Sequence, residues 1–218
     1  MHSIETLNIV GHRNEILPST FFRQKDESPH IAVIFPGFGY TAQMPLMYYP
    51  GRLLLESGAD VLLVGYNYFK RPDFRSAPDE ERDVWLRTDT IAAYEAALAE
   101  RDYERVTLVG KSIGTRGMGH LLSTTDPLPS LQCVWLTPIL RNEQLCAQIK
   151  QNPCSSLFVV GSADSHYDPV KLAEVQQATG GKAIVIENAD HSLEIPGDIV
   201  ESIRALEGII AEIQKFLS

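Results

Sequence analysis

The segment Gly110-Lys111-Ser112-Ile113-Gly114 is the part of the sequence whose residue types and spacing point most directly to chemistry. It follows an apolar run and precedes a helical pattern, so it is a GxSxG sequence in the strand–turn–helix setting that exposes a nucleophilic serine. The two glycines permit a turn sharp enough to lift the Ser112 hydroxyl off a sheet. The alternative is a glycine-rich turn in which Ser112 only caps the following helix.

A base has to take the proton of a nucleophilic serine, and a third group has to orient that base. Among the six histidines, His191 has the most suitable position, because it lies just beyond the last expected strand. Its loop should emerge at the same sheet edge as Ser112. We therefore predict that His191 is the base, and the alternative is a loop histidine without a role.

The orienting carboxylate is expected between Ser112 and His191 in the chain. An apolar run at 156–160 ends in Gly161-Ser162-Ala163-Asp164, which places Asp164 at the carboxyl end of a strand. Asp168 is a rival, but Asp168-Pro169 is typical of a helix start. Asp190 is adjacent to His191 and points elsewhere if His191 points inward. We favour Asp164 over these rivals, and the alternative for Asp164 itself is a plain turn carboxylate.

Acyl transfer also needs N–H donors aimed at the oxygen that becomes negative. The backbone N–H of Ile113, at the start of a helix, is one candidate. The second is the N–H of Phe38, in the loop Pro36-Gly37-Phe38-Gly39-Tyr40, where glycines let the backbone approach a ligand closely. The alternative for this loop is a plain Gly-Pro turn.

These residues need a sheet that brings their loops to one edge, and the rest of the chain predicts such a sheet. Short apolar runs, most without alternation, are typical of strands covered on both faces; they lie at 31–35, 60–66, 105–109, 131–137, 156–160 and 183–187. Helical patterns separate them, at 48–57, 79–100, 113–123, 141–151, 169–179 and 198–216. This alternation indicates an α/β fold with a mostly parallel sheet and helices on both faces. Segments 5–10 and 15–22 are expected to pair as an antiparallel hairpin at its edge.

Composition sets the broad class of the protein. The chain has 218 residues, and 19 Lys and Arg stand against 28 Asp and Glu, for a formal net charge of −9. This length fits a single domain spanning 1–218, and the lack of a basic run argues against a nucleic-acid partner. Three cysteines without CxxC spacing predict neither a disulfide framework nor a zinc site. With no signal-like or membrane-length apolar stretch, we expect a cytoplasmic protein without a membrane partner.

Four motifs together give a family resemblance: FPGFG at 35–39, VGKSIG at 109–114, GSAD at 161–164 and ENADHSLE at 187–194. With the order Ser–Asp–His, the chain resembles small, lidless α/β-hydrolases, near the dienelactone-hydrolase-like families and small bacterial hydrolases of unassigned substrate. The resemblance implies a roughly eight-stranded sheet without a cap domain, and Ser112 as nucleophile, Asp164 as acid and His191 as base. It also implies an oxyanion hole at Phe38 and Ile113, and neither a metal nor an organic cofactor.

The chain departs from the families that it resembles in three places. Dienelactone hydrolases use a cysteine nucleophile, whereas position 112 is a serine. The loop after the first core strand begins with Phe35-Pro36-Gly37 instead of the His-Gly of many esterases. Lys111 occupies the position just before the nucleophile, where a charged side chain is unusual. The resemblance therefore supports the mechanism better than the substrate.

A substrate pocket is expected near the strand ends. Tyr40, Met44 and Tyr68 are candidate walls, and further candidates of the same kind are Phe38, Met47, Tyr66 and Phe69. The alternative for such a set is helix–sheet packing. Lys70 and Arg71 are candidates to meet an anionic group of a substrate, and a solvated loop explains them equally well.

The function that these features predict is a serine hydrolase that cleaves a carboxylic ester or a thioester through an acyl-enzyme. Its partner is a small-molecule acyl substrate. The first alternative is an acyltransferase that uses the same three residues. The second is a non-enzymatic interaction protein on the same fold, whose expected mark is the loss of a catalytic residue.

Overall fold

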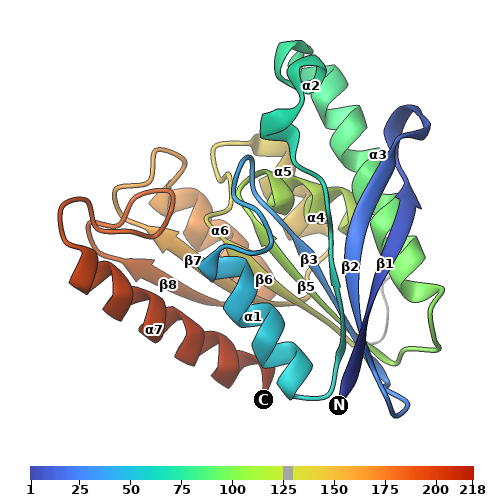
Figure 1. Ribbon diagram of the computed structural model, residues 1–218. Coiled ribbons are helices and arrows are strands. Elements are labelled where there is room, and N and C mark those ends of the chain that lie inside the picture. Colours follow the sequence, from blue (N-terminus) through green and yellow to red (C-terminus); the bar gives the residue numbers. More distant parts are fainter. Residues whose placement is uncertain (125–129) are drawn as a thin grey trace.

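A single sheet of eight strands runs through the computed structural model, which describes residues 1–124 and 130–218 (Figure 1). The strands lie side by side in the order β1-β2-β4-β3-β5-β6-β7-β8. Their bounds are β1 His2–Val10, β2 Ile16–Gln24, β3 His30–Phe35, β4 Asp60–Leu63, β5 Arg105–Lys111, β6 Leu131–Leu136, β7 Ser155–Gly161 and β8 Lys182–Ile186.

The sheet is parallel from β4 to β8, and β1 and β2 form an antiparallel hairpin that joins it along β4. This confirms the predicted mostly parallel sheet with an antiparallel hairpin at its edge. β4 ends at Leu63, earlier than predicted. Pro18 of β2 has no N–H to donate, and a Cβ on Gly65 would lie 1.9 Å from the carbonyl oxygen of Pro18. The ladder between β2 and β4 therefore stops before Gly65.

Helices cover both faces of the sheet, as the alternating pattern predicts (Figure 1). One face carries α1 (Pro45–Glu56) and α7 (Ile199–Leu217), which pack against each other. The opposite face carries a row of four helices in contact: α3 Asp79–Leu98, α4 Ile113–Thr124, α5 Glu143–Gln151 and α6 Pro169–Thr179. The short elements are η1 His12–Asn14, η2 Tyr68–Lys70 and α2 Pro72–Ser76.

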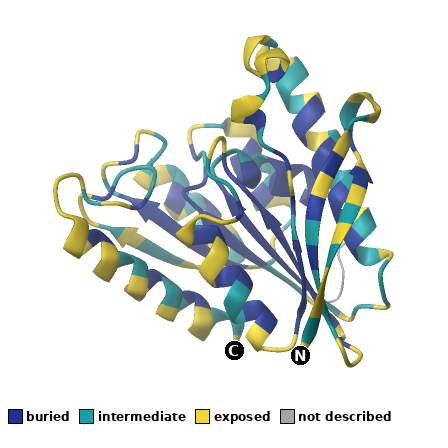
Figure 2. Cartoon of the chain, viewed as in Figure 1, coloured by how far each residue is buried: buried dark blue, intermediate teal, exposed yellow. Residues whose placement is uncertain are grey.

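The core lies in two layers, one between the sheet and each set of helices. All six residues of β3 are buried, and Figure 2 shows buried residues along the central strands and on the inner sides of the helices. Because both sides of these strands are covered, their sequences are continuous apolar runs rather than alternations. The hairpin differs, since β1 is largely exposed along one side.

Side-chain caps explain where several helices begin. The Asp168 carboxylate accepts hydrogen bonds from the backbone N–H groups of Val170 and Lys171, and Pro169 is the first residue of α6. Gly180 follows that helix with a φ of 62°, in the left-handed region that glycine adopts without strain. Asn142 and Asp198 cap α5 and α7 in the same way.

The interval between β6 and β7 bears on whether a lid covers the site. It contains only α5 as a helix, and the predicted absence of a cap domain holds for the described residues. Within those same ranges, 1–124 and 130–218, no helix is both long and apolar enough to cross a membrane.

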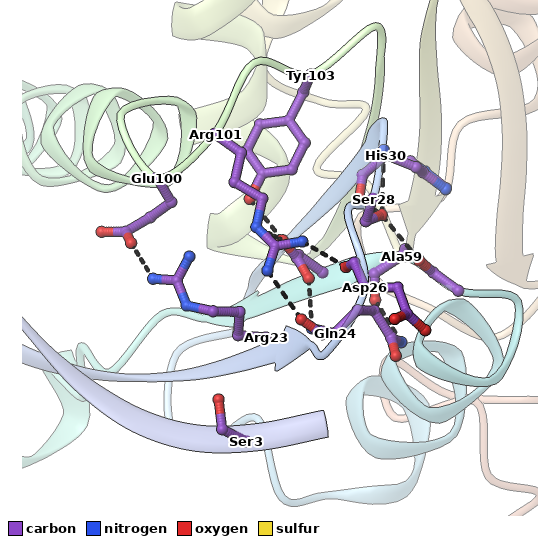
Figure 3. A network of polar contacts seen from close by, with 12 residues as sticks. Ser3, Arg23, Gln24, Asp26, Ser28, His30, Ala59, Glu100, Arg101 and Tyr103 are labelled. Carbon is purple, nitrogen blue, oxygen red and sulfur yellow. Dashed lines mark hydrogen bonds and ion pairs between the residues drawn. The ribbon is translucent and has the colours of Figure 1, made fainter. Parts of the chain in front are cut away.

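A polar network closes the amino ends of the parallel strands (Figure 3). Asp60, the fully buried first residue of β4, accepts hydrogen bonds from the Gln24 backbone N–H at 2.6 Å and the Tyr103 hydroxyl at 2.8 Å. The Arg101 guanidinium donates to the carbonyl oxygens of Gln24 and Asp26 and lies 3.5 Å from the Asp60 carboxylate. The network thereby ties the hairpin to the segment before β5.

Candidate active site

Ser112 occupies a tight turn between the end of β5 and the start of α4. Its φ is 52°, a left-handed conformation that costs energy for a residue with a side chain. A Cβ on Gly114 would lie 2.3 Å from the Phe35 carbonyl oxygen, and one on Gly110 would lie 2.3 Å from the Met118 sulfur. A side chain at Gly114 would collide with the backbone of Phe35, and one at Gly110 would press on the buried Met118 side chain, so both glycines favour the tight turn at Ser112.

His191 lies between Ser112 and Asp164, the two residues that the sequence predicts as its partners. The His191 Nε2 atom lies 2.8 Å from the Ser112 hydroxyl oxygen, and its Nδ1 atom lies 2.7 Å from an Asp164 carboxylate oxygen. An ionised carboxylate only accepts hydrogen bonds, so Nδ1 carries the proton and Nε2 is free to accept one from Ser112. This tautomer is the one that a general base requires.

Asp164 is held as a carboxylate. Its side chain is 1% exposed, and its second oxygen accepts a hydrogen bond from the His166 backbone N–H at 2.8 Å. Burial opposes ionisation, but the hydrogen bonds from His191 and His166 outweigh it and hold the pKa of Asp164 below its ordinary value of 3.8. The carboxylate is therefore suited to stabilise a positive charge on His191.

The two rival carboxylates have other partners. Asp168 caps α6. Asp190 accepts hydrogen bonds from the backbone N–H groups of Ser192 and Glu194, at 2.7 and 3.2 Å, within its own turn. The structure thus brings Asp164, and neither Asp168 nor Asp190, to the Nδ1 side of His191.

The loop after β3 lies directly against the nucleophile. A Cβ on Gly37 would lie 3.5 Å from the Ser112 Cβ, and the Gly37 N–H donates to the Tyr40 carbonyl oxygen at 2.9 Å. Phe38 follows Gly37 in this turn. Ile113 is the first residue of α4, where backbone N–H groups lack partners within the helix. Their roles as oxyanion donors stay predictions.

A hollow of about 350 Å³ opens beside Ser112 and His191. The predicted pocket residues Tyr40 and Met44 are among its walls. The full lining is Phe38, Gly39, Tyr40, Met44, Phe69, Lys111, Ser112, His191 and Ser192. Because three of the walls are the exposed apolar side chains of Phe38, Met44 and Phe69, the hollow offers an apolar surface next to the serine.

The prediction that Tyr68 lines the pocket is wrong. Tyr68 is 2% exposed, its ring stacks between those of Tyr66 and Phe74, and its hydroxyl donates to Asp89 at 2.8 Å. In the tight turn of η2 the chain sends Tyr68 into the core and the next residue, Phe69, toward solvent and the hollow.

Other pocket candidates also lie elsewhere. Met47 and Tyr66 are buried in the core. Arg71 forms ion pairs with Glu15 and Asp73, so its charge is matched at the hairpin and not at the hollow. Lys70, beside it, is exposed.

Lys111 makes contacts within the site that its position in the sequence does not predict. It is 2% exposed, and its ammonium donates to the Thr137 hydroxyl at 3.0 Å and to the His191 carbonyl oxygen at 2.7 Å. The one signal in the sequence is a charged residue inside an otherwise apolar strand end. His166 is also closer than expected, since its ring centre lies 5.1 Å from that of His191.

Comparison with known proteins identifies the family of the chain. The sequence profile of the alpha/beta hydrolase domain matches residues 30–217, which is most of the chain. The protein is an α/β-hydrolase. The comparison with curated proteins found no match.

Solved structures show the same fold for this α/β-hydrolase at low sequence identity. An esterase from Pyrococcus furiosus is 14% identical with a TM-score of 0.70, over 99% of this chain and 92% of that one. A serine hydrolase without a lid from Xanthomonas campestris is 15% identical with a TM-score of 0.71, over 99% and 94%. A dienelactone hydrolase from Anabaena variabilis is 16% identical with a TM-score of 0.68, over 99% and 96%.

Proposed function

We propose that this α/β-hydrolase is a serine hydrolase that cleaves a carboxylic ester or a thioester through an acyl-enzyme. The observation that carries the proposal is the continuous hydrogen-bonded chain from the Ser112 hydroxyl through both nitrogens of His191 to the buried Asp164 carboxylate. In this arrangement a neutral imidazole accepts the serine proton, and a carboxylate stabilises the imidazolium that forms.

The reaction proceeds in two halves. His191 Nε2 takes the Ser112 proton while the serine oxygen attacks the carbonyl carbon, and the N–H groups of Phe38 and Ile113 bind the oxyanion. The intermediate collapses, His191 gives its proton to the departing alkoxide or thiolate, and the acyl group stays on Ser112. Water, activated by His191, then attacks the acyl-enzyme and releases the carboxylic acid.

The walls of the hollow favour an uncharged, apolar group next to the scissile bond. Phe38 is 42% exposed, Met44 is 39% exposed and Phe69 is 53% exposed, and all three line the hollow. The single cation among the lining residues, Lys111, is buried and donates to groups of the protein. We therefore expect neutral acyl chains to be preferred over acyl groups that carry a carboxylate.

The test compares wild type, Ser112→Ala and Ser192→Ala. Ser192 is the matched control, because it lines the same hollow and adjoins His191. The substrates are p-nitrophenyl esters from acetyl to decanoyl and one thioester of the best acyl group, and a fluorophosphonate probe reports the reactive serine. Ser112→Ala is expected to lose probe labelling and to reduce kcat by a factor on the order of 10⁶, whereas Ser192→Ala keeps labelling.

Two outcomes count against the proposal. Labelling that persists in Ser112→Ala would mean that another residue is the nucleophile. Wild type that neither labels nor turns over any ester or thioester would favour a non-enzymatic role on this fold.

A further inference from the structure

The ammonium group of Lys111 contacts three of the loops that build the site. Its ammonium donates to the His191 carbonyl oxygen at 2.7 Å and to the Thr137 hydroxyl at 3.0 Å, and it lies 4.7 Å from the centre of the Tyr40 ring. These partners come from three separate loops at the carboxyl ends of the strands. Lys111 itself adjoins Ser112, so one side chain links all three loops to the nucleophile turn.

Burial of this charge is costly, and its partners account for it. A buried ammonium is tolerated when acceptors and negative charges surround it. The carboxylates of Asp164 and Asp190 supply the negative charge near Lys111. Because all these partners belong to the protein, we expect the Lys111 ammonium to hold parts of the protein in place and not to bind a substrate.

The histidine loop needs such a contact. The His191 side chain is 34% exposed, and within residues 1–124 and 130–218 the partners of its two nitrogens are Ser112 and Asp164. The loop around it turns through left-handed residues at Asn188 and Leu193. A hydrogen bond to the carbonyl oxygen of His191 therefore fixes the backbone from which the base extends.

We propose that Lys111 is a positioning residue whose buried ammonium fixes the backbone of His191 against the nucleophile turn. The inference rests on the proposed function, since it concerns the geometry of the proposed base. A displacement of about 1 Å in a catalytic group can reduce a rate by about 10²-fold, so the loss of this contact should be measurable in kcat.

The charge of Lys111 gives the proposal a pH signature. Burial lowers the pKa of Lys111 to about 8, although Asp164 and Asp190 favour the charged form. The other groups that face it are the His191 carbonyl, the Thr137 hydroxyl and the Tyr40 ring. Below this pH the ammonium is charged and donates strongly, and above it the contact weakens. Wild-type kcat is therefore expected to fall as the pH rises through about 8.

The experiment measures kcat and KM for the best p-nitrophenyl ester from pH 6 to pH 10. The variants are Lys111→Met, Lys111→Arg and, as a control, Lys150→Met, which removes a lysine that pairs with Glu174 away from the site. Lys111→Met is expected to lower kcat at pH 7 by about 10²-fold with little change in KM. Lys111→Arg, whose charge persists to high pH, should retain more activity than Lys111→Met, and its kcat should not fall as the pH rises. Lys150→Met should match wild type.

A second variant and a spectroscopic measurement keep the inference testable if Lys111→Met does not fold. Thr137→Val removes one acceptor of the ammonium, so the kcat of this variant should begin to fall at a lower pH than the kcat of wild type. The proton on His191 Nδ1, bound to Asp164, should give a downfield resonance that is sharp in wild type and broadened in the Lys111 and Thr137 variants.

The outcomes separate this inference from the proposed function. Normal wild-type turnover together with unchanged kcat, pH profile and Nδ1 resonance in the variants would overturn the role of Lys111 and leave the serine hydrolase standing. Absence of Ser112-dependent labelling and turnover in wild type would reject the hydrolase. In that case the resonance still decides whether Lys111 holds the His191 loop.

Discussion

The two edges of the sheet each contain a buried carboxylate, and they use it differently. At the amino edge, Asp60 is fully buried, accepts hydrogen bonds from the Gln24 N–H and the Tyr103 hydroxyl, and forms an ion pair with the Arg101 guanidinium. Gln24 belongs to the hairpin, and Arg101 and Tyr103 belong to the segment before β5, so the network joins these two parts of the chain. Burial and the Asp60 carboxylate raise the pKa of Tyr103, so its hydroxyl stays a donor.

At the carboxyl edge, Asp164 is also buried, but the chain of hydrogen bonds that begins there ends at a hydroxyl beside the hollow. It passes through His191 to the Ser112 hydroxyl, which lines the hollow. The backbone at this edge is left-handed at Ser112 and Thr137, with φ values of 52° and 44°. Strain of this kind persists only where the surrounding structure holds it, and it concentrates at functional sites. The network at the amino edge joins segments of the fold, whereas the one at the carboxyl edge positions the nucleophile of the proposed hydrolase.

Among substitutions that compare the two edges, the largest expected effect separates two carboxylates near the carboxyl edge, Asp164 and Asp168. Asp164→Asn should lower kcat by about 10⁴-fold, because an amide no longer fixes the tautomer in which His191 Nε2 accepts a proton. Asp168→Asn is the matched control, since asparagine caps a helix about as well as aspartate and kcat should stay near that of wild type. Steady-state kinetics on the best ester measures both. A greater loss in Asp168→Asn would show that Asp168, and not Asp164, orients the base.

Substitutions at the amino edge should lower the stability of the fold and leave kcat unchanged. Asp60→Ala removes the shared acceptor of the network and should reduce the free energy of unfolding by about 3 kcal/mol, with kcat unchanged. Tyr103→Phe, which removes one of its donors, should cost about 1 kcal/mol. Urea unfolding and ester kinetics on the same samples test this contrast. Lower kcat at unchanged stability in Asp60→Ala would break the division between the two edges.

Tyr68 and Phe69 are adjacent in the chain, but Tyr68 lies in the core and Phe69 lines the hollow. Phe69→Ala should raise KM for longer acyl esters several-fold, because it removes an apolar wall worth about 1 kcal/mol of contact. Tyr68→Phe should leave KM unchanged and lower stability by about 1 kcal/mol through the lost hydrogen bond to Asp89. Equal KM values for Phe69→Ala and wild type across the ester series would mean that the acyl group lies elsewhere.

A smaller effect concerns acid stability. The pKa of Asp164 is lower in the folded protein than its ordinary value of 3.8, so this carboxylate stabilises the fold above that pH and loses its contribution as the pH falls through the folded pKa. Wild type should therefore lose more stability than Asp164→Asn between pH 5 and the acid range below the folded pKa. Thermal unfolding at a series of pH values measures the difference, and parallel curves for the two proteins would contradict it.

The sequence predicted the elements well where local rules decide them. Continuous apolar runs predicted the buried strands, and Asp168-Pro169 predicted the start of α6, because capping and burial are properties of short segments. The end of β4 was predicted too late, since it depends on Pro18 lying opposite Gly65, a pairing between distant parts of the chain.

By itself, the sequence determined the sheet, the serine turn and the order Ser112, Asp164, His191, because the carboxyl ends of parallel strands share an edge and loops that follow them meet there. Only the tertiary structure decided which carboxylate reaches His191, which of Tyr68 and Phe69 turns inward, and what the Lys111 ammonium touches. Those outcomes depend on side-chain directions at distances of a few ångströms between segments far apart in the chain. Residue spacing sets the edge at which side chains gather, and packing sets which of them touch.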